Sequence, residues 1–113
     1  MSFPPDQIAE LQALVPGVMA CREGVVSYFL LPGLQLPAGC TPSKVDALLC
    51  PTPRDGYESR LFFSQLVTST SARNWHVTNT RIVDRQWCAF SWKTNKTGLR
   101  LAQMVVEHLC AIK

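Results

Sequence analysis

Apolar residues near the N-terminus recur at the spacing of an amphipathic helix. Ile8, Leu11 and Leu14 follow one another at three-residue intervals, so one face of a helix carries all of them. Asp6 precedes this run and is expected to cap its first turn. Pro16, followed by a glycine, ends the pattern. The sequence therefore predicts a helix between Asp6 and Pro16.

Four stretches farther along the chain are rich in β-branched and aromatic residues and are separated by turn residues. Such runs are typical of strands, and the short connections between them indicate an antiparallel meander rather than crossover helices. The apolar stretch Leu31–Pro37 is open to two interpretations, a surface that docks a partner or continued strand pairing around a glycine bulge. The four expected strands are Val18–Cys21, Val25–Leu31, Lys44–Cys50 and Arg60–Val67.

The segment Thr68–Lys96 shows no sustained period of either kind. Connections of that length in a compact domain are usually functional, and this one holds all three tryptophans together with His76 and Cys88. We therefore expect an ordered loop with an active or binding site, anchored by aromatic burial. The apolar residues of Leu99–Ile112 return to helical spacing and predict a C-terminal helix that covers one face of the sheet.

Length and composition indicate a single folded domain, residues 1–113. The chain is 47% hydrophobic and 17% charged, which is enough apolar surface for one core. Its net charge of +3 is too small for a dedicated nucleic-acid binder. The charge is unevenly distributed, because residues 1–72 hold four basic and six acidic side chains, and residues 73–113 hold seven basic and two acidic ones. A charged partner is therefore expected to meet the C-terminal part.

Targeting signals and metal-binding patterns are not visible in the sequence. The N-terminus lacks the pattern of a secretory signal, and no apolar stretch is long enough to span a membrane. The five cysteines include no Cys-x-x-Cys pair, and there are only two histidines, which argues against a zinc site. We therefore expect a cytoplasmic protein with reduced thiols, no cofactor or metal, no membrane contact and no nucleic-acid partner.

The long segment carries the residues with the clearest chemical potential. Cys88 can act as a nucleophile when it is a thiolate, a state that the nearby cations Arg81, Arg85 and Lys93 would favour. The amide of Asn79 can donate to an oxyanion during acyl transfer. In the alternative interpretation, Cys88 is a small buried hydrophobe between two tryptophans and Asn79 caps a turn. The cations then form a solvated surface or steer an acidic partner.

The other candidate residues have simpler interpretations. Cys50 lies within an apolar strand, and Cys110 falls on the apolar side of the last helix, so both are expected in the core. His108 is expected near the end of that helix, where the dipole favours its charge. A hydrolase that pairs Cys88 with His76 is a further possibility, although no carboxylate clearly completes a triad.

The order of these features resembles the ubiquitin-conjugating-enzyme family, and in particular a small bacterial branch of it. The shared features are a helix, an antiparallel meander, a proline-containing turn, a histidine and an asparagine close together, a cysteine soon after, a tryptophan and a final helix. The matching segments are Leu36–Pro42, Val45–Leu49, Pro53–Glu58, His76–Asn79 and Trp87–Ser91. The resemblance covers residues 6–112. It implies an α+β, UBC-like fold with an N-terminal helix, a four-stranded antiparallel meander, a long active-site loop and a C-terminal helix.

The resemblance also implies a function. Members of the family carry a ubiquitin-like modifier as a cysteine thioester, which they receive from an activating enzyme and transfer to an amine. In this chain Cys88 would form the thioester, Asn79 would polarise its carbonyl, His76 would hold the loop in shape and Trp92 would pack beneath it. The implied partners are a ubiquitin-like modifier protein and an activating enzyme, in a bacterial cytoplasm and a setting of antiviral defence. The alternative is a catalytically silent relative that binds a ubiquitin-like protein.

Overall fold

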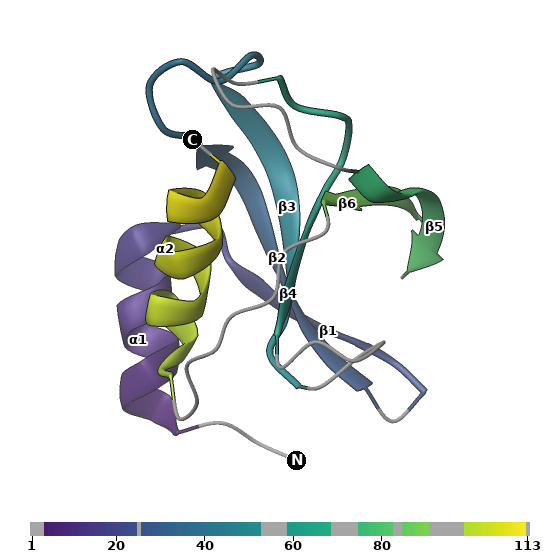
Figure 1. Cartoon of the computed structure of the whole chain (residues 1–113). Helices are drawn as coiled ribbons and strands as arrows, with labels where there is room; N and C mark the ends of the chain where they lie inside the picture. Colours follow the sequence, from purple (N-terminus) through teal and green to yellow (C-terminus); the bar gives the residue numbers. More distant parts are fainter. Residues whose placement is uncertain are drawn as a thin grey trace.

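Six antiparallel strands form one curled sheet, and two helices lie together against one of its faces (Figure 1). The structure is a computed structural model that describes residues 4–24, 26–52, 59–68, 75–82, 85–90 and 99–112. The strand order across the sheet is β1-β2-β3-β4-β6-β5. The elements are α1 (Pro5–Leu14), β1 (Met19–Glu23), β2 (Val26–Gln35), β3 (Lys44–Cys50), β4 (Arg60–Phe63), β5 (Trp75–Ile82), β6 (Arg85–Phe90) and α2 (Leu101–Ile112).

The UBC-like fold expected from the sequence is wrong. In place of a four-stranded meander with a long active-site loop, the described residues form a curled six-stranded antiparallel sheet with two short helices. The expected irregular loop contains β5 and β6, which pair with each other and extend the sheet beyond β4. The sequence hides β5 because two register shifts interrupt its pairing with β6, and an extra residue breaks the two-residue period of a strand.

Several local predictions agree with the structure. Both terminal helices are present, and strands occupy the four ranges expected for the meander, although β4 ends at Phe63 rather than at Val67. β2 continues past Pro32 to pair with β3, with a register shift between Leu31 and Leu34. Gly33 has a φ of +63° there, a conformation that side chains disfavour. The bulge interpretation of this apolar stretch is therefore confirmed.

Both faces of the central strands are covered by apolar side chains. Successive residues of a strand point to opposite faces, so Phe62 and Phe63 of β4 enter different clusters, and each is at most 1% exposed. The first cluster lies between the sheet and the helices and includes Leu11 of α1 and Leu101 of α2. The second lies on the opposite face and includes Trp87 of β6. This arrangement explains the near-continuous apolar runs of β2 to β4.

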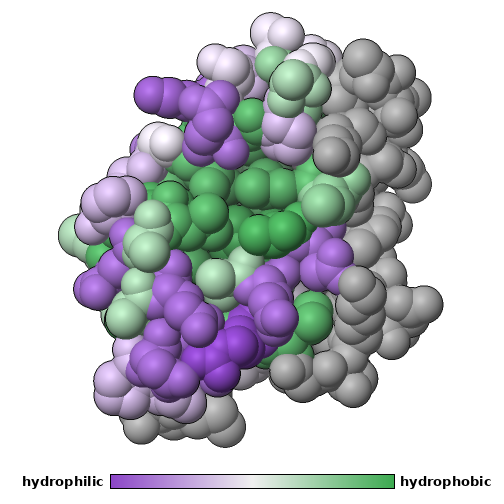
Figure 2. Space-filling model, turned by 90° about the vertical axis from the view of Figure 1, so that its left-hand side faces the viewer, coloured by the Kyte–Doolittle hydropathy of each residue, from purple (hydrophilic) through white to green (hydrophobic). Residues whose placement is uncertain are grey.

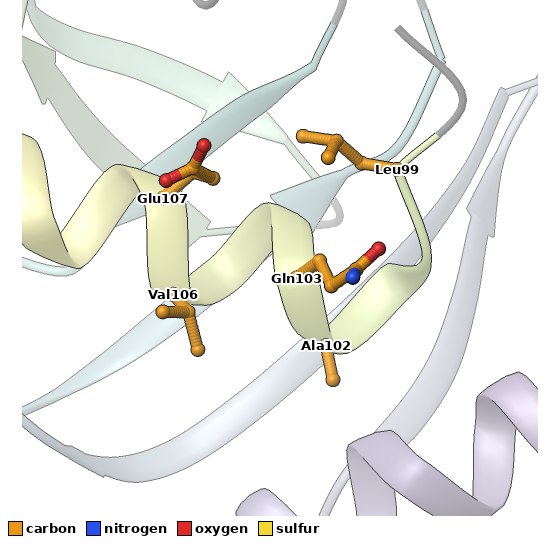
Figure 3. A pocket seen from close by; sticks show the side chains of 5 residues that line it. All are labelled: Leu99, Ala102, Gln103, Val106 and Glu107. Atoms are coloured by element: carbon orange, nitrogen blue, oxygen red, sulfur yellow. The ribbon is translucent and has the colours of Figure 1, made fainter. Parts of the chain in front are cut away.

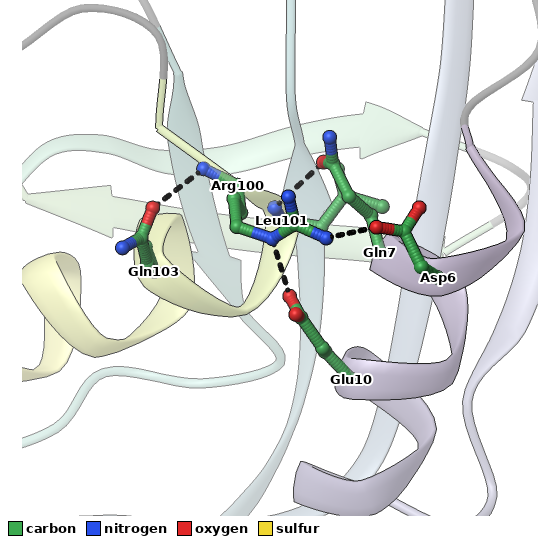
Figure 4. A network of polar contacts seen from close by, with 6 residues as sticks. All are labelled: Asp6, Gln7, Glu10, Arg100, Leu101 and Gln103. Carbon is green, nitrogen blue, oxygen red and sulfur yellow. Dashed lines mark hydrogen bonds and ion pairs between the residues drawn. The ribbon is translucent and has the colours of Figure 1, made fainter.

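Arg100, just before α2, holds the two helices together by polar contacts (Figure 4). Its Nε donates to Glu10 at 2.8 Å, and its Nη2 donates to Asp6. The backbone N–H of Leu101 donates to the Gln7 side chain at 3.2 Å. The expected cap at Asp6 is therefore not formed: α1 begins after a proline without a side-chain cap. The guanidinium hydrogen bond instead lowers the pKa of Asp6.

Candidate functional site

The hairpin of β5 and β6 brings the predicted site residues onto neighbouring strands. The register shifts between Val77 and Thr80, so that two residues of β5, Thr78 and Asn79, lie opposite the single residue Cys88 of β6. This two-against-one arrangement is a β-bulge, a feature that re-aims side chains and is common beside active sites. The backbone therefore places Asn79 across the ladder from Cys88.

A second irregularity of β5 falls at His76. The strand pairs at Trp75 with Phe90 and at Val77 with Ala89, which leaves His76 as an extra residue on its own strand. The two predicted site residues of β5 thus both coincide with breaks in its ladder.

Cys88 is buried where β6 meets the rest of the sheet. It is directly opposite Phe63 of β4 and is 7% exposed. Burial raises the pKa of the Cys88 thiol, because a low-polarity environment disfavours the thiolate. A nucleophilic role is helped by an exposed thiol with a depressed pKa, so the observed burial agrees better with the second interpretation, in which Cys88 is a small buried hydrophobe.

The predicted basic residues differ in their surroundings. Arg85 forms a salt bridge with Asp46 of β3 at 3.2 Å, and its guanidinium stacks over the Trp87 ring at 4.8 Å from the centroid. Its side chain remains 43% exposed. Arg81 is exposed on β5. Lys93 and Trp92, the other two predicted binding residues, lie outside the described residues.

Asp46 is a residue that sequence reasoning missed. Its Oδ1 accepts a hydrogen bond from the N–H of Gly33 at 2.9 Å, while Oδ2 pairs with Arg85. Asp46 therefore joins the bulge of β2 to the hairpin that carries Cys88. The signal in the sequence is a single carboxylate within the apolar run of β3, since such a residue needs polar partners where it is partly buried.

A buried serine–histidine contact joins β4 to α2. Ser59 Oγ lies 3.1 Å from His108 Nε2, and both residues are 3% exposed. Burial, with a smaller contribution from the positive charge of Arg60, lowers the pKa of His108 to about 4. The prediction that the helix dipole favours a charged His108 is therefore wrong, because burial disfavours the charged form. Arg60 is itself a buried cation, 2% exposed, with its guanidinium over the Phe62 ring.

The remaining cysteines are only partly as expected. Cys50 is fully buried in the second cluster, as predicted. Cys110 is exposed on α2 rather than buried, so its predicted core position is wrong. Cys40 is 8% exposed, and burial raises the pKa of its thiol. Cys21 is partly exposed in β1.

The helical side of the molecule presents an apolar surface. Figure 2 shows hydrophobic residues gathered on this face between polar ones, and Leu14 of α1 and Val106 of α2 are 40% and 47% exposed. An open pocket of about 340 Å³ lies along α2. It is lined by Leu99, Ala102, Gln103, Val106 and Glu107, with Ala102 and Val106 on the same side of the helix (Figure 3). This surface has the apolar character of a protein contact site.

Comparisons with protein-family models, with curated proteins and with solved structures give no match for this chain. Within the described ranges, no group of three or more His, Cys, Asp and Glu residues has the arrangement of a metal site. None of the helices that the structure describes has the length and apolarity needed to cross a membrane. The site must therefore be interpreted from its own residues.

Proposed function

We propose that the protein carries a ubiquitin-like modifier as a thioester on Cys88, in the manner that its sequence resemblance implies. The observation that supports this proposal is the bulge that sets Asn79 across the ladder from Cys88. In acyl transfer to a thiol, an asparagine amide is one of the donors that can stabilise the tetrahedral oxyanion intermediate. The support therefore rests on the backbone positions of these two residues on neighbouring strands and not on the fold class.

The proposed reaction is a pair of acyl transfers. The Cys88 thiolate attacks the carbonyl carbon of the modifier's C-terminal thioester on the activating enzyme, whose own thiol departs. An amine then attacks the new thioester, an amide forms, and Cys88 leaves as a thiolate. Asn79 would donate a hydrogen bond to the oxyanion in both steps.

Burial of Cys88 lowers the reactivity of its thiol. Since burial raises the pKa of Cys88, its thiolate fraction at neutral pH is smaller than that of an ordinary exposed thiol. We expect Cys88 to react slowly with small alkylating reagents. Thioester formation then depends on an activating enzyme that presents an already activated carboxyl group.

A binding protein without thiol chemistry is the second candidate. It is favoured by the low exposure of Cys88 and by the apolar surface on α1 and α2. In this form the protein holds a ubiquitin-like partner without a covalent bond, and Cys88 is a packing residue.

A charging assay distinguishes the two candidates. The purified protein is incubated with the activating enzyme and ubiquitin-like protein of the same organism and ATP, and products are separated with and without reductant. We expect a reductant-sensitive adduct with the wild type and with the exposed-thiol control Cys110→Ala. Cys88→Ala should give none, and Cys88→Ser should give an oxyester that survives reductant.

The opposite results favour the binding protein. If the wild type forms no adduct, or if Cys88→Ala still forms one, Cys88 is not the acceptor. Binding of the ubiquitin-like protein without ATP, measured by NMR titration, then tests the second candidate: Val106→Asp should weaken binding, while Cys88→Ala should leave it unchanged.

A further inference from the structure

The first strand forms one edge of the sheet in the part of the chain that the structure describes. Within the described residues β1 pairs only with β2. Four of its five residues are exposed, and Met19 is 55% exposed. Figure 1 shows β1 at the outside of the sheet, running away from the helices. An edge strand presents N–H and C=O groups that can pair with a further strand.

We propose that two copies of the chain associate by antiparallel pairing of β1 with β1, around a two-fold axis at Cys21. In an antiparallel ladder, two residues that face each other are either both hydrogen-bonded across the ladder or both not, and the two kinds alternate. When β1 pairs with β1 of a second copy, each residue must face a residue of the same kind. Even-numbered positions therefore face even-numbered positions, and odd-numbered positions face odd-numbered ones. Within β1 this leaves three central registers, with Ala20, Cys21 or Arg22 on the axis.

The charged residues of β1 select among these registers. With Arg22 on the axis, two guanidinium groups face each other directly, which destabilises the pair. With Ala20 on the axis, only three residues of β1 are aligned. With Cys21 on the axis all five are aligned, Met19 faces Glu23, Ala20 faces Arg22, and no like charges are directly opposite. The register with Cys21 on the axis is therefore the favoured one.

This register joins two sheets of six strands into one continuous sheet. The two-fold axis runs perpendicular to the sheet, so the helices of both copies lie on the same face of the continuous sheet. The two Cys21 side chains lie together on the opposite face, the face of Tyr28, which is the β2 partner of Cys21. Facing residues of an antiparallel pair have Cα atoms about 4.5–5.5 Å apart, and disulfides need about 4.4–6.8 Å. A disulfide between the two Cys21 residues can therefore form in this register, and its formation tests the register.

The first test is cross-linking with diamide, which takes two electrons and two protons from a pair of thiols as the disulfide forms. We expect a covalent dimer with the wild type and with Cys110→Ser, which removes the other accessible thiol. Cys21→Ser should abolish it. A dimer that requires Cys110, or no dimer at concentrations where the protein is shown to associate, would overturn the register.

The second test uses the exposed position Ala20, which faces Arg22 twice in each dimer. Ala20→Glu adds two opposite-charge pairs and should tighten the dimer roughly 2- to 30-fold, and Ala20→Lys should weaken it by a similar factor. Sedimentation equilibrium measures both dissociation constants, and circular dichroism checks that both variants fold. A protein that is monomeric at all concentrations, or two variants that do not differ, would contradict the proposal. The outcome is independent of any thioester on Cys88.

Discussion

The two faces of the sheet are packed by different kinds of side chains. The face toward the helices is filled mainly by Leu and Val residues together with Phe29 and Phe63, and side chains from α1 and α2 close it. The other face gathers Tyr28, Phe62 and Trp87 around smaller residues and is closed by the hairpin of β5 and β6. The helices cover one face, and the curl of the sheet covers the other.

The difference matters because the candidate site lies on the hairpin. β3 and β4 share four register pairs, whereas β4 and β6 share one, Phe63 with Cys88, among the described residues. Backbone pairing therefore holds the hairpin less firmly than it holds the meander. Side-chain packing in the second cluster must supply most of the rest, because the partly exposed Asp46–Arg85 pair contributes little.

The largest expected effect comes from Phe63 and Phe62, adjacent residues that serve opposite faces. Each is nearly fully buried, so replacement by Ala should lower the free energy of unfolding by about 3–5 kcal/mol. Phe63→Ala should also speed alkylation of Cys88, because Phe63 is directly opposite the thiol, and Phe62→Ala should do so less. Urea unfolding and timed alkylation measure both effects. A nearly neutral substitution at either position would show that its face is not a packed core.

Acid should destabilise the helical side through His108. Its folded pKa of about 4 lies below the ordinary value of 6.5, so the unfolded state binds the proton first as pH falls. The lowered pKa of His108 makes the free energy of unfolding about 3 kcal/mol higher above pH 6.5 than well below pH 4. This difference is lost progressively as the pH falls from about 6.5 toward 4. About 2 kcal/mol of this is lost between pH 7 and pH 5, and the free energies of unfolding at these two pH values measure that loss. In His108→Gln the difference between the two pH values should shrink; an unchanged difference would assign it to other groups.

A smaller effect is expected from Trp87→Phe within the second cluster. The indole Nε1 donates to the carbonyl of Ile82 at 3.0 Å in a buried setting, and a phenyl ring leaves that carbonyl without this donor. The cost should be about 1–3 kcal/mol, and hydrogen exchange should show the hairpin opening before the meander. Phe62→Leu is the control for lost volume alone. Equal loss of protection in β2 and β6 would mean that the hairpin is not a separate unit.

The smallest effect is expected at the exposed contacts of Arg100. Its pairs with Asp6 and Glu10 are solvent-accessible, and such pairs contribute little and are screened by salt. Arg100→Ala should lower the melting temperature slightly at low ionic strength and less at high ionic strength. The control Lys44→Ala should show no such salt dependence. A large, salt-independent loss would instead place Arg100 among the packing residues.

The sequence predicted most of the local structure, whereas its choice of site residues stays a prediction. Prolines and glycines delimit the meander clearly, and the helical spacing of both terminal segments is regular. The hairpin was missed because the bulges at His76 and Asn79 interrupt the alternation that identifies a strand. The burial of Cys88 was also beyond sequence reasoning, since it depends on Phe63, a residue 25 positions away that only the folded sheet brings opposite.

Asp46 gives the sheet a means of alignment that its apolar residues cannot supply. Because both faces of β3 are apolar, a slip by one residue would exchange the two faces without exposing much apolar surface to water, and hydrophobic patterning alone discriminates weakly against it. The carboxylate of Asp46 does discriminate against the slipped register. In a slipped sheet it would face the helices, away from the Gly33 N–H and the Arg85 guanidinium, and a buried charge without partners is costly. A single charged side chain thus favours the observed register of β3 over a register slipped by one residue.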